Sequence, residues 1–599
     1  MSVANASRGP MDLERQEMPA QAISELDIPH DRLARAGADA GAIPQRFHVR
    51  SGTWRYTRGM QTHEVTNQPP PLAGYDLYGA DVALVEAVHR EGGGWGDDAL
   101  RALGTTAGSA EAIEWGFTAN AYPPVLHTHD RYGNRRDQVT YHPAYHQLMT
   151  LAVAHGAHAA PWADGRAGAH VVRAAKLFVL SQVEAGHTCP ISMTYASVPA
   201  LRAAPELAAE WEPRIISRAY DPRCLPAHEK RGALIGMAMT EKQGGSDVRA
   251  NTTRAEPLGG GEYRITGHKW FCSAPMSDAF LVLAQAPGGL SCFLLPRWRP
   301  DGTRNALALQ RLKDKLGNRS NASAEVELHG AWARLVGEEG RGVATIIQMV
   351  SHTRLDCAIS SAAGMRLGAA QAIHHATHRQ AFGRALVDQP LMRAVLADLV
   401  VESEAATALA FRLARAYDAD EDHHEAALRR LATPLAKYWV CKRATAHAAE
   451  ALECLGGNGY VEDSGMPRLL RDSPLNGIWE GSGNVICLDA LRVLGRHPEA
   501  AEAFAAEVEA VAEADGCLDR FWRTLRADLA RPSEAGARLL VERMALALQG
   551  ALLARRGDPA VADAFCATRL DGKWGRAFGA LPPGIGVDAI IDRAAVKAV

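Results

Sequence analysis

The chain has 599 residues, of which 47% are hydrophobic and 22% charged, and its formal net charge is −3. This composition is typical of a globular protein and excludes a mainly disordered, collagen-like or coiled-coil chain. The near-neutral charge also excludes a uniformly basic nucleic-acid coat protein, although a local basic face stays compatible with it. At about 150 residues per domain, the length predicts about four domains.

Cysteine usage and apolar runs indicate the compartment. The ten cysteines form no C-x-x-C pair, which predicts free thiols in a reducing environment. No apolar run reaches the ~18 residues that a membrane helix needs. Residues 1–59 combine eight arginines with seven acidic residues, whereas mitochondrial presequences are poor in acid. We therefore expect a cytoplasmic protein that does not contact membranes.

The first two segments differ in periodicity. Residues 1–59 mix Ala, Gly, Pro and Arg without a repeat, which predicts a disordered extension, and Met60 is a second candidate start. Residues 60–230 are expected to form a helical domain, because Ala-rich stretches such as His170–Val183 alternate with polar breaks. Asn134–Asp137 has the composition of a polar turn.

Strand-like sequence follows. Residues 231–342 contain short apolar or alternating runs separated by Gly-Gly, Pro-Gly and Asp-Gly pairs, which predicts an all-β domain. Helical periodicity returns over 343–497, where Pro434 is expected near a helix start or at a kink. Residues 498–599 are predicted to form an appended helical domain that ends in a tail from 581.

Two glycine- or aromatic-containing segments suggest a cofactor site. In Met237–Asp247 (MAMTEKQGGSD) a strand would deliver Met239 and Thr240, and the glycines would let backbone N–H groups approach an anion. In Gly267–Ser273 (GHKWFCS) aromatic residues before a small hydroxyl residue can flank a flat heteroaromatic ring. A plain turn and a strand with buried aromatic residues are the respective alternatives.

Three further segments come from the helical region. Arg379, with Gln389 downstream, offers a fork for phosphate or a solvated helix face. Leu455–Tyr460 (LGGNGY) alone predicts a helix end. In Ile478–Asn484 (IWEGSGN) a single carboxylate follows two apolar residues, a setting that raises its pKa and suits a general base. A helix-capping role for Glu480 is the alternative.

In this order, the five segments resemble the acyl-CoA dehydrogenase superfamily over residues 62–497. GMAMTEKQGGSDVRANTTRAE, GHKWFCSAP, LKDKLGNRSNASAEVEL and IWEGSGNVICLDALRVL are closer still to its flavoproteins of the adaptive response to DNA alkylation, a resemblance that covers nearly everything from Gln61. It implies an α+β fold with an N-terminal helical domain, a middle β-barrel domain and a C-terminal four-helix bundle, followed by the appended helical domain.

The resemblance also implies a site for FAD and an acyl-CoA, with Glu480 as the catalytic base. The residues matched to FAD contacts are Met237, Met239, Thr240, Gly245, Ser246, Trp270, Phe271, Cys272, Ser273, Arg379, Phe382, Gln389, Gly456, Gly457, Ile478, Trp479, Gly481, Ser482 and Asn484. Arg379, Phe382 and Gln389 match positions that reach the FAD of a neighbouring subunit, which implies a homotetramer. Trp479 replaces the tyrosine usual in the family and, with Phe271, is expected to restrict the substrate to short or branched acyl groups such as isovaleryl-CoA, with slow turnover.

Basic residues accumulate near the C-terminus. Residues 520–576 contain eleven basic and six acidic side chains, a difference of +5. Such a stretch favours nucleic-acid phosphates without base recognition, and a solvated surface is the alternative. The resemblance implies duplex DNA binding through Arg492 and Lys573, and we add the nearby candidates Arg520, Arg523 and Arg576. No metal site is predicted.

Three functions remain open on sequence alone. The first is an FAD protein that binds duplex DNA and protects or repairs it under alkylation stress, with weak acyl-CoA dehydrogenation. The second is a metabolic acyl-CoA dehydrogenase whose C-terminal block only supports assembly. The third is a DNA-binding protein in which FAD is structural.

Overall fold

The computed structural model describes residues 62–419, 422–512 and 515–596. The predicted extension at 1–59 lies outside the described residues. Residues 65–599 form one compact unit, so the domain boundaries near 230, 342 and 497 stay predictions about organisation inside that unit. Among the described helices, none is both long and apolar enough to cross a bilayer.

Helices make up most of the first part of this unit. Helix α6 is buried at all fifteen positions and packs against the long helix α9, so it forms the centre of this region. The elements are α1 (Val82–Arg90), η1 (Gly94–Gly96), α2 (Asp97–Ala107), α3 (Ala110–Ala121), α4 (Pro143–Ala154), α5 (Ala160–Ala163), α6 (Ala169–Val183), α7 (Thr188–Leu201), α8 (Pro205–Ile215) and η2 (Ala227–Glu229).

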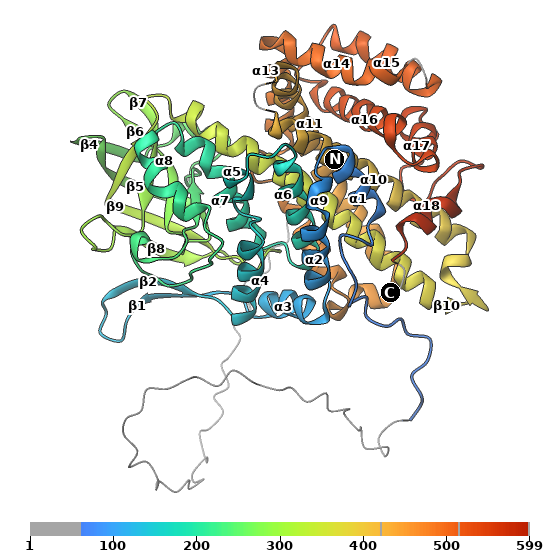
Figure 1. Cartoon of the computed structure of the whole chain (residues 1–599), viewed down its shortest axis with the longest axis horizontal. Coiled ribbons are helices and arrows are strands. Elements are labelled where there is room, and N and C mark those ends of the chain that lie inside the picture. Colours follow the sequence, from blue (N-terminus) through green and yellow to red (C-terminus); the bar gives the residue numbers. More distant parts are fainter. Residues whose placement is uncertain (1–61, 420–421, 513–514, 597–599) are drawn as a thin grey trace, which may run out of the picture. The chain divides into compact units, whose positions relative to one another are not determined.

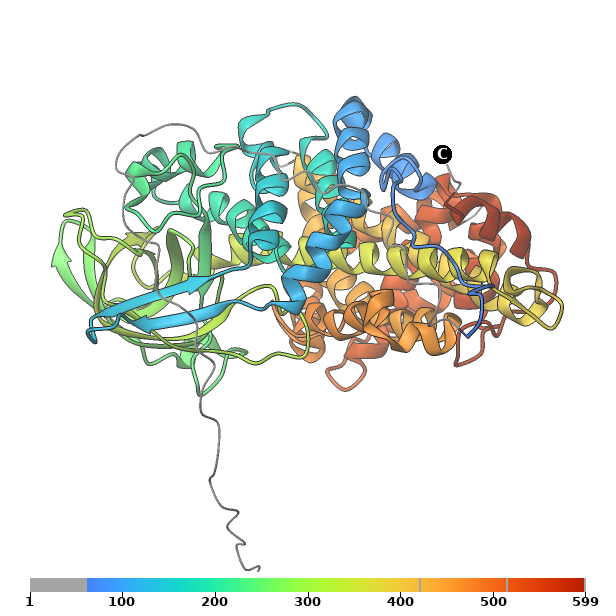
Figure 2. The same ribbon diagram turned by 90° about the horizontal axis from the view of Figure 1, so that it is seen from below.

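A hairpin interrupts these helices. Strands β1 (Val125–His129) and β2 (Arg135–Thr140) are antiparallel, and they lie along the β domain beside β8 (Figure 2). The predicted turn at Asn134–Asp137 is wrong, because Asp130 makes the turn: its side chain accepts from the backbone N–H groups of Tyr132 and Asn134. Arg135 already belongs to β2.

The β domain is a seven-stranded sheet that closes on itself. The strands pair in the order β3-β6-β4-β5-β9-β7, β8 joins β9, and β6 also pairs with β7 to complete the barrel. Strands β5 and β9 are antiparallel, and their register sets Ser273 opposite Ser323. The strands are β3 (Ile235–Ala238), β4 (Arg254–Gly259), β5 (Glu262–Ser273), β6 (Ala279–Ala286), β7 (Gly289–Pro296), β8 (Leu307–Leu312) and β9 (Ser323–Val336), with η3 (Val248–Ala250) before β4.

Three long helices follow the barrel and pack on one another (Figure 1). They are α9 (Gly342–His378), α10 (Pro390–Asp418) and α11 (His423–Cys454). Pro434 lies well inside α11, so the expectation of a helix start is wrong, and the alternative of a kink stays a prediction. Short elements complete the region: β10 (Gln380–Ala381), β11 (Arg384–Ala385), η4 (Leu386–Asp388), η5 (Gly456–Tyr460), η6 (Glu462–Ser464), α12 (Met466–Asp472), η7 (Leu475–Gly477) and α13 (Gly483–Arg496).

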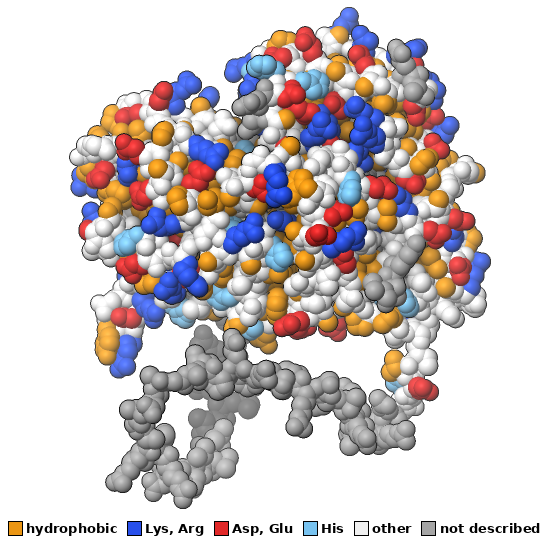
Figure 3. All heavy atoms as spheres, viewed as in Figure 1, with side chains coloured by type: hydrophobic (Ala, Val, Ile, Leu, Met, Phe, Trp, Pro, Cys, Tyr) orange, Lys and Arg blue, Asp and Glu red, His pale blue; other side chains and the backbone are white. Residues whose placement is uncertain are grey.

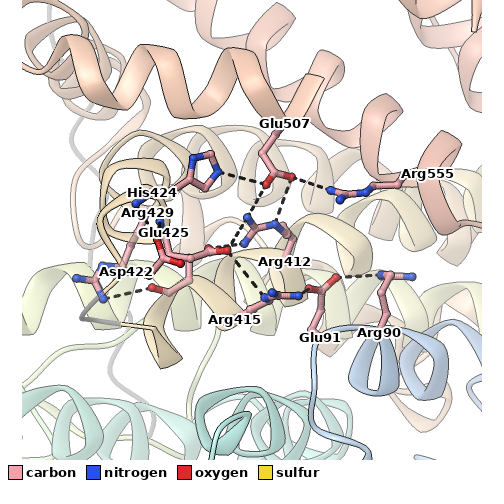
Figure 4. Close-up of polar contacts among 11 residues, drawn as sticks. Arg90, Glu91, Arg412, Arg415, Asp422, His424, Glu425, Arg429, Glu507 and Arg555 are labelled. Atoms are coloured by element: carbon pink, nitrogen blue, oxygen red, sulfur yellow. Dashed lines mark hydrogen bonds and ion pairs between the residues drawn. The ribbon is translucent and has the colours of Figure 1, made fainter. Parts of the chain in front are cut away.

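The appended block packs directly on the long helices. Arg412 of α10 donates to Glu425 of α11 at 2.7 Å and to Glu507 of α14 at 2.6 Å, at the centre of a cluster of ion pairs (Figure 4). The block consists of α14 (Pro498–Ala512), α15 (Gly516–Leu529), α16 (Ala537–Arg556), α17 (Pro559–Phe565), the π-helix η8 (Cys566–Leu570) and α18 (Val587–Ala594). Helix α18 falls in the segment that we expected to be a tail.

Candidate functional site

Glu480 lies in a strained loop between η7 and α13. Its φ of 60° is in the left-handed region, which non-glycine residues rarely adopt, and Gly481 follows with φ of 108°. A carboxylate held in such a conformation needs support from its surroundings, and strain of this kind concentrates at functional sites. The loop is therefore the first place where a reaction centre is expected.

Two basic side chains from different helices hold this loop. Arg354 of α9 donates from Nε to the carbonyl oxygen of Glu480 at 3.0 Å, and Lys437 of α11 donates from Nζ to that of Gly481 at 2.5 Å. Sequence reasoning missed both. The only available signal was a lysine inside the otherwise apolar stretch LATPLAKYWV.

The Glu480 carboxyl group has the environment of a base. Its Oε2 atom is buried, and no hydrogen bond from the described residues reaches that atom. Burial raises the pKa of Glu480 above its ordinary value, while the Thr353 hydroxyl and the charges of Arg354 and Lys437 oppose that rise. The carboxylate is thus more basic than an exposed glutamate and has an open lone pair.

A cavity opens beside the loop. Its empty space, counting the solvent-filled mouth, is about 690 Å³, and Trp479 forms part of its wall. Trp479 is fixed because its Nε1 donates to Asn476 Oδ1 at 2.9 Å, and Asn476 in turn donates to Ser361 of α9. The wall also includes residues of α6, α11 and α12, so the cavity extends from the loop into the helical region.

The loop after β3 reaches the same region. Met237 and Met239 are half-buried in the apolar cluster that also contains Trp479, and Trp270 donates its backbone N–H to the carbonyl oxygen of Thr240 at 2.8 Å. A Cβ on Gly245 would lie 2.4 Å from Thr240 Oγ1, so this position requires glycine. Ser246, beside it, is exposed.

A buried ion pair anchors this loop to the barrel. Lys269 of β5 donates to Glu241 at 2.9 Å, and both side chains are at most 1% exposed. Burial alone would raise the pKa of Glu241, but Lys269 and the N–H groups of Thr252 and Thr253 outweigh burial and lower it. Besides their predicted contacts with the cofactor, the segments TEKQGG and GHKW therefore contribute a structural ion pair, Glu241–Lys269.

The end of β5 divides its residues between two faces. The Nζ atom of Lys313 lies over the Trp270 ring, 2.9 Å from its centre. The side chain of Phe271 is half-exposed. The hydroxyl oxygens of Ser273 and Ser323 are 3.4 Å apart. Cys272 points the other way, into the barrel core, where burial raises the pKa of its thiol to about 12. Only the backbone of Cys272 is available to a bound ligand.

The start of α13 offers unengaged polar groups. Ser482 is the N-cap residue but makes no side-chain capping bond. Ser482, Asn484 and Ile478 are exposed. They stand next to Glu480 in the chain, and the N-terminus of α13 adds backbone N–H groups, so this segment can meet a negatively charged or carbonyl-bearing ligand.

A second group of predicted residues lies at the other end of α9. Arg379 is the C-cap residue of α9, and its guanidinium donates to the carbonyl oxygen of Asn67 at 2.6 Å. The side-chain amide of Gln389 donates to the carbonyl oxygen of Ala381. Phe382, at the tip of the β10–β11 hairpin, is 99% exposed. Gly456 and Gly457 face open space. Asn458, next to them, donates to Gln68, so residues 67–68 connect the hairpin and η5.

These two groups do not meet within one chain. Helix α9 has 37 residues, and at about 1.5 Å per residue the 25 residues from Arg354 to Arg379 span about 38 Å. The hairpin and the barrel lie at opposite ends of the molecule (Figure 1). Arg379, Phe382, Gln389, Gly456 and Gly457 are therefore separate from Glu480 in this chain.

Most of the predicted DNA contacts already have acidic neighbours. Arg520 and Lys573 share Asp571, at 2.6 and 3.3 Å, and Arg523 pairs with Asp519. Arg492 pairs with Asp489 at 2.7 Å. Arg576 is exposed. Basic and acidic side chains are interspersed over the face seen in Figure 3.

One arginine in the +5 count does not face solvent. Arg569, in the π-helix, is 1% exposed and pairs with Asp398 at 2.5 Å and with Glu402 at 3.1 Å, both on α10. The counted excess of positive charge therefore overstates the charge available to a polyanion.

Comparisons with known proteins agree with this architecture. Residues 67–222 match the family model of the adaptive response protein AidB N-terminal domain, and residues 236–331 and 340–495 match the middle and C-terminal domains of acyl-CoA dehydrogenases. The chain is 49% identical over 517 residues to the putative acyl-CoA dehydrogenase AidB of Escherichia coli (strain K12), covering 86% of this chain and 96% of that protein. The chain belongs to the AidB family.

Structural similarity extends beyond bacteria. The crystal structure of Caenorhabditis elegans ACDH-11 in complex with C11-CoA superposes with a TM-score of 0.78 at 29% identity, covering 86% of this chain and 94% of that one. Acyl-CoA dehydrogenase family member 11 of the same organism is 34% identical over 67% of each chain. The predicted acyl-CoA dehydrogenase fold of this AidB-family chain is thus confirmed.

Proposed function

We propose that this AidB-family protein is an FAD-dependent dehydrogenase of acyl-CoA thioesters that also binds duplex DNA and protects or repairs it under alkylation stress. The observation that supports the catalytic part is the buried Oε2 atom of Glu480, which accepts no hydrogen bond from the described residues and stands next in the chain to Trp479 of the cavity wall. The AidB relationship supports the DNA part.

Glu480 would remove the proton next to the thioester carbonyl. Its free Oε2 lone pair is the acceptor, and Arg354 and Lys437 keep the loop in position during the transfer. The N–H groups at the start of α13 would stabilise negative charge on the thioester oxygen. FAD, when bound, supplies the acceptor for the hydride that leaves the neighbouring carbon.

The residues present fit FAD. Exposed Ser246, Ser482 and Asn484 supply polar contacts, and Trp270 and Phe271 supply flat apolar ones. The Arg379–Phe382 and Gly456–Gly457 group lies too far from Glu480 to serve the same cofactor in one chain, which supports a site completed by a second copy and the homotetramer expected from the sequence.

The acyl group would enter the cavity beside Trp479. The bulk of Trp479 supports a short or branched acyl chain such as that of isovaleryl-CoA, with slow turnover. The C. elegans relative was crystallised with C11-CoA. Flavin reduction by isovaleryl-CoA and by a C11 acyl-CoA should therefore be compared directly, and preference for the C11 substrate would contradict our proposal.

One observation favours the metabolic alternative, in which the C-terminal block only supports assembly. Arg569 and Glu507 of that block are held in ion pairs with α10, so the block contributes to the stability of the long helices. Stabilising the long helices is compatible with DNA binding by the C-terminal block, but it would explain the presence of the block without DNA binding.

Duplex-DNA binding decides between these functions. Fluorescence anisotropy at two salt concentrations should show steep salt dependence for the full chain. Replacing Arg492, Arg520 and Lys573 together by glutamine should weaken binding, whereas the charge-matched change of the exposed Arg136, Arg249 and Arg299 should not. Absence of binding by the full chain would favour the metabolic dehydrogenase.

A further inference from the structure

Helix α13 carries a carboxylate that contacts both the interior and the surface. Asp489 accepts with Oδ2 from Arg354 Nη1 at 2.7 Å and with Oδ1 from Arg492 Nη1 at 2.7 Å. The Arg354 side chain is 10% exposed and the Arg492 side chain is 57% exposed. One carboxylate therefore joins a nearly buried guanidinium to an exposed one.

The inner guanidinium continues to the candidate base. While Nη1 of Arg354 binds Asp489, its Nε donates to the carbonyl oxygen of Glu480 at 3.0 Å. A guanidinium is planar and presents its donors in a fixed fork, so the two bonds are geometrically coupled. The sequence of contacts runs from solvent through Arg492, Asp489 and Arg354 to Glu480, and each step is at most 3.0 Å long.

We propose that Asp489 is a positioning residue that makes the readiness of Glu480 to accept a proton depend on whether a DNA phosphate is bound at Arg492. This inference rests on the proposed function, because it takes the phosphate from duplex DNA. A phosphate that binds Arg492 competes with Asp489 for its guanidinium, and Asp489 then acts on Arg354 alone.

Few other groups near Glu480 can produce the same effect. Those that face it are Thr353, Arg354 and Cys357 of α9, Lys437 of α11 and Cys189 of α7. Burial raises the pKa of Cys189 to about 11 and raises that of Cys357 well above its ordinary value, so both thiols are neutral at physiological pH. Of these charges, only Arg354 has a described contact that leads to the surface through α13.

The direction of the effect follows from the charges. A phosphate at Arg492 adds negative charge, which disfavours the Glu480 carboxylate and raises the midpoint at which it loses its proton. Removing the cation of Arg492 should act in the same direction, whereas removing the charge of Asp489 should lower the midpoint. A unit charge about 10 Å away changes such a midpoint by about half a pH unit.

The test uses the FAD-loaded protein and (methylthio)acetyl-CoA, a short 3-thiaacyl thioester whose charge-transfer absorbance with flavin appears when its α-proton is removed. The midpoint of that absorbance against pH is measured for the wild type, Arg492→Gln, Asp489→Asn and the control Arg496→Gln, which changes an exposed arginine of the same helix. Each is titrated without polyanion, with duplex DNA and with inorganic tripolyphosphate. Hydrogen exchange of residues 478–484 gives a readout independent of flavin.

We expect duplex DNA to raise the wild-type midpoint by about half a unit. In Asp489→Asn the shift should be smaller, because only the direct effect of the phosphate charge remains there. An equal shift in both proteins would overturn the role of Asp489. Equal midpoints and equal exchange in all four proteins would overturn the inference. DNA that binds without moving the wild-type midpoint would also overturn it, while DNA binding itself would stand. If the protein binds no duplex, the proposed DNA-binding function is wrong. If tripolyphosphate alone moves the midpoint, the ligand at Arg492 is a small phosphate anion and not DNA.

Discussion

Lys437 donates its Nζ to the carbonyl oxygen of Gly481 at 2.5 Å, one residue past Glu480. The lysine is 1% exposed, and among the described residues no carboxylate lies within ion-pair distance of it. Its charge is therefore directed at the backbone of the loop. A cation placed in the interior for this purpose serves positioning, because a buried unpaired charge costs free energy.

Replacing Lys437 by methionine keeps most of the side-chain volume and removes the bond to the loop. We expect kcat for acyl-CoA-dependent flavin reduction to fall about 10- to 100-fold, because small displacements of a catalytic group carry costs of this size. The control is Lys442→Met, an exposed lysine on the same helix. Equal kcat values for the two variants, both with full FAD content, would contradict the positioning role.

Glu480→Gln should abolish the reaction while FAD binding and thermal stability persist. Loss of the base is expected to lower the rate of flavin reduction by at least about 10²-fold. In the wild type, burial raises the pKa of Glu480, so the active carboxylate is lost as pH falls through that raised value. The rate should therefore decline at a higher pH than an exposed glutamate would give. Stopped-flow absorbance over pH 5–9, a range that spans about two units around neutrality, measures both effects.

Gly481→Ala should destabilise the loop. The backbone there has φ of 108°, and the new Cβ would lie 3.0 Å from Ile486 Cδ1. We expect a loss of about 1–3 kcal/mol in the free energy of unfolding. Gly495→Ala, on α13, meets no atom within 4 Å and should be neutral or stabilising by up to about 1 kcal/mol. Thermal unfolding compares the two, and an unchanged Tm for Gly481→Ala would refute the strain argument.

Arg569→Met should weaken the attachment of the appended block. It leaves Asp398 buried without its guanidinium and Glu402 with Arg443 as its remaining cation, a change that costs about 3–5 kcal/mol. The exposed Arg576→Met should change stability little. Unfolding in urea and limited proteolysis near η8 would reveal the difference. The same ion pairs mean that cutting the chain after residue 497 would disturb α10, so substitutions test DNA binding more cleanly than truncation.

Much of this fold follows from sequence patterns. The short apolar runs at 280–285 and 290–296 predicted strands, and the sequence of 170–183 predicted a buried helix; the structure confirms both predictions. The hairpin at 125–140 was not predicted, because His and Thr alternate there with few apolar residues and mimic a loop.

The site was predictable only where residues cluster along the chain. Glu480 and its neighbours stand in one recognisable segment, whereas Arg354, Lys437 and Asp489 are single charges on three different helices. Their convergence depends on how those helices pack, which no local pattern records. Arg569 shows the converse: its charge suggested a surface role, and tertiary packing gave it a buried one.

The length of α9 has a genetic consequence. If each catalytic centre takes Glu480 from one copy and Arg379 from another, two inactive variants can restore each other. In a mixed pair of Glu480→Gln and Arg379→Ala chains, one centre collects both defects and the other collects none. Co-expression of the two mutants would therefore restore dehydrogenase activity, because the length of α9 keeps Glu480 and Arg379 of one chain in different centres.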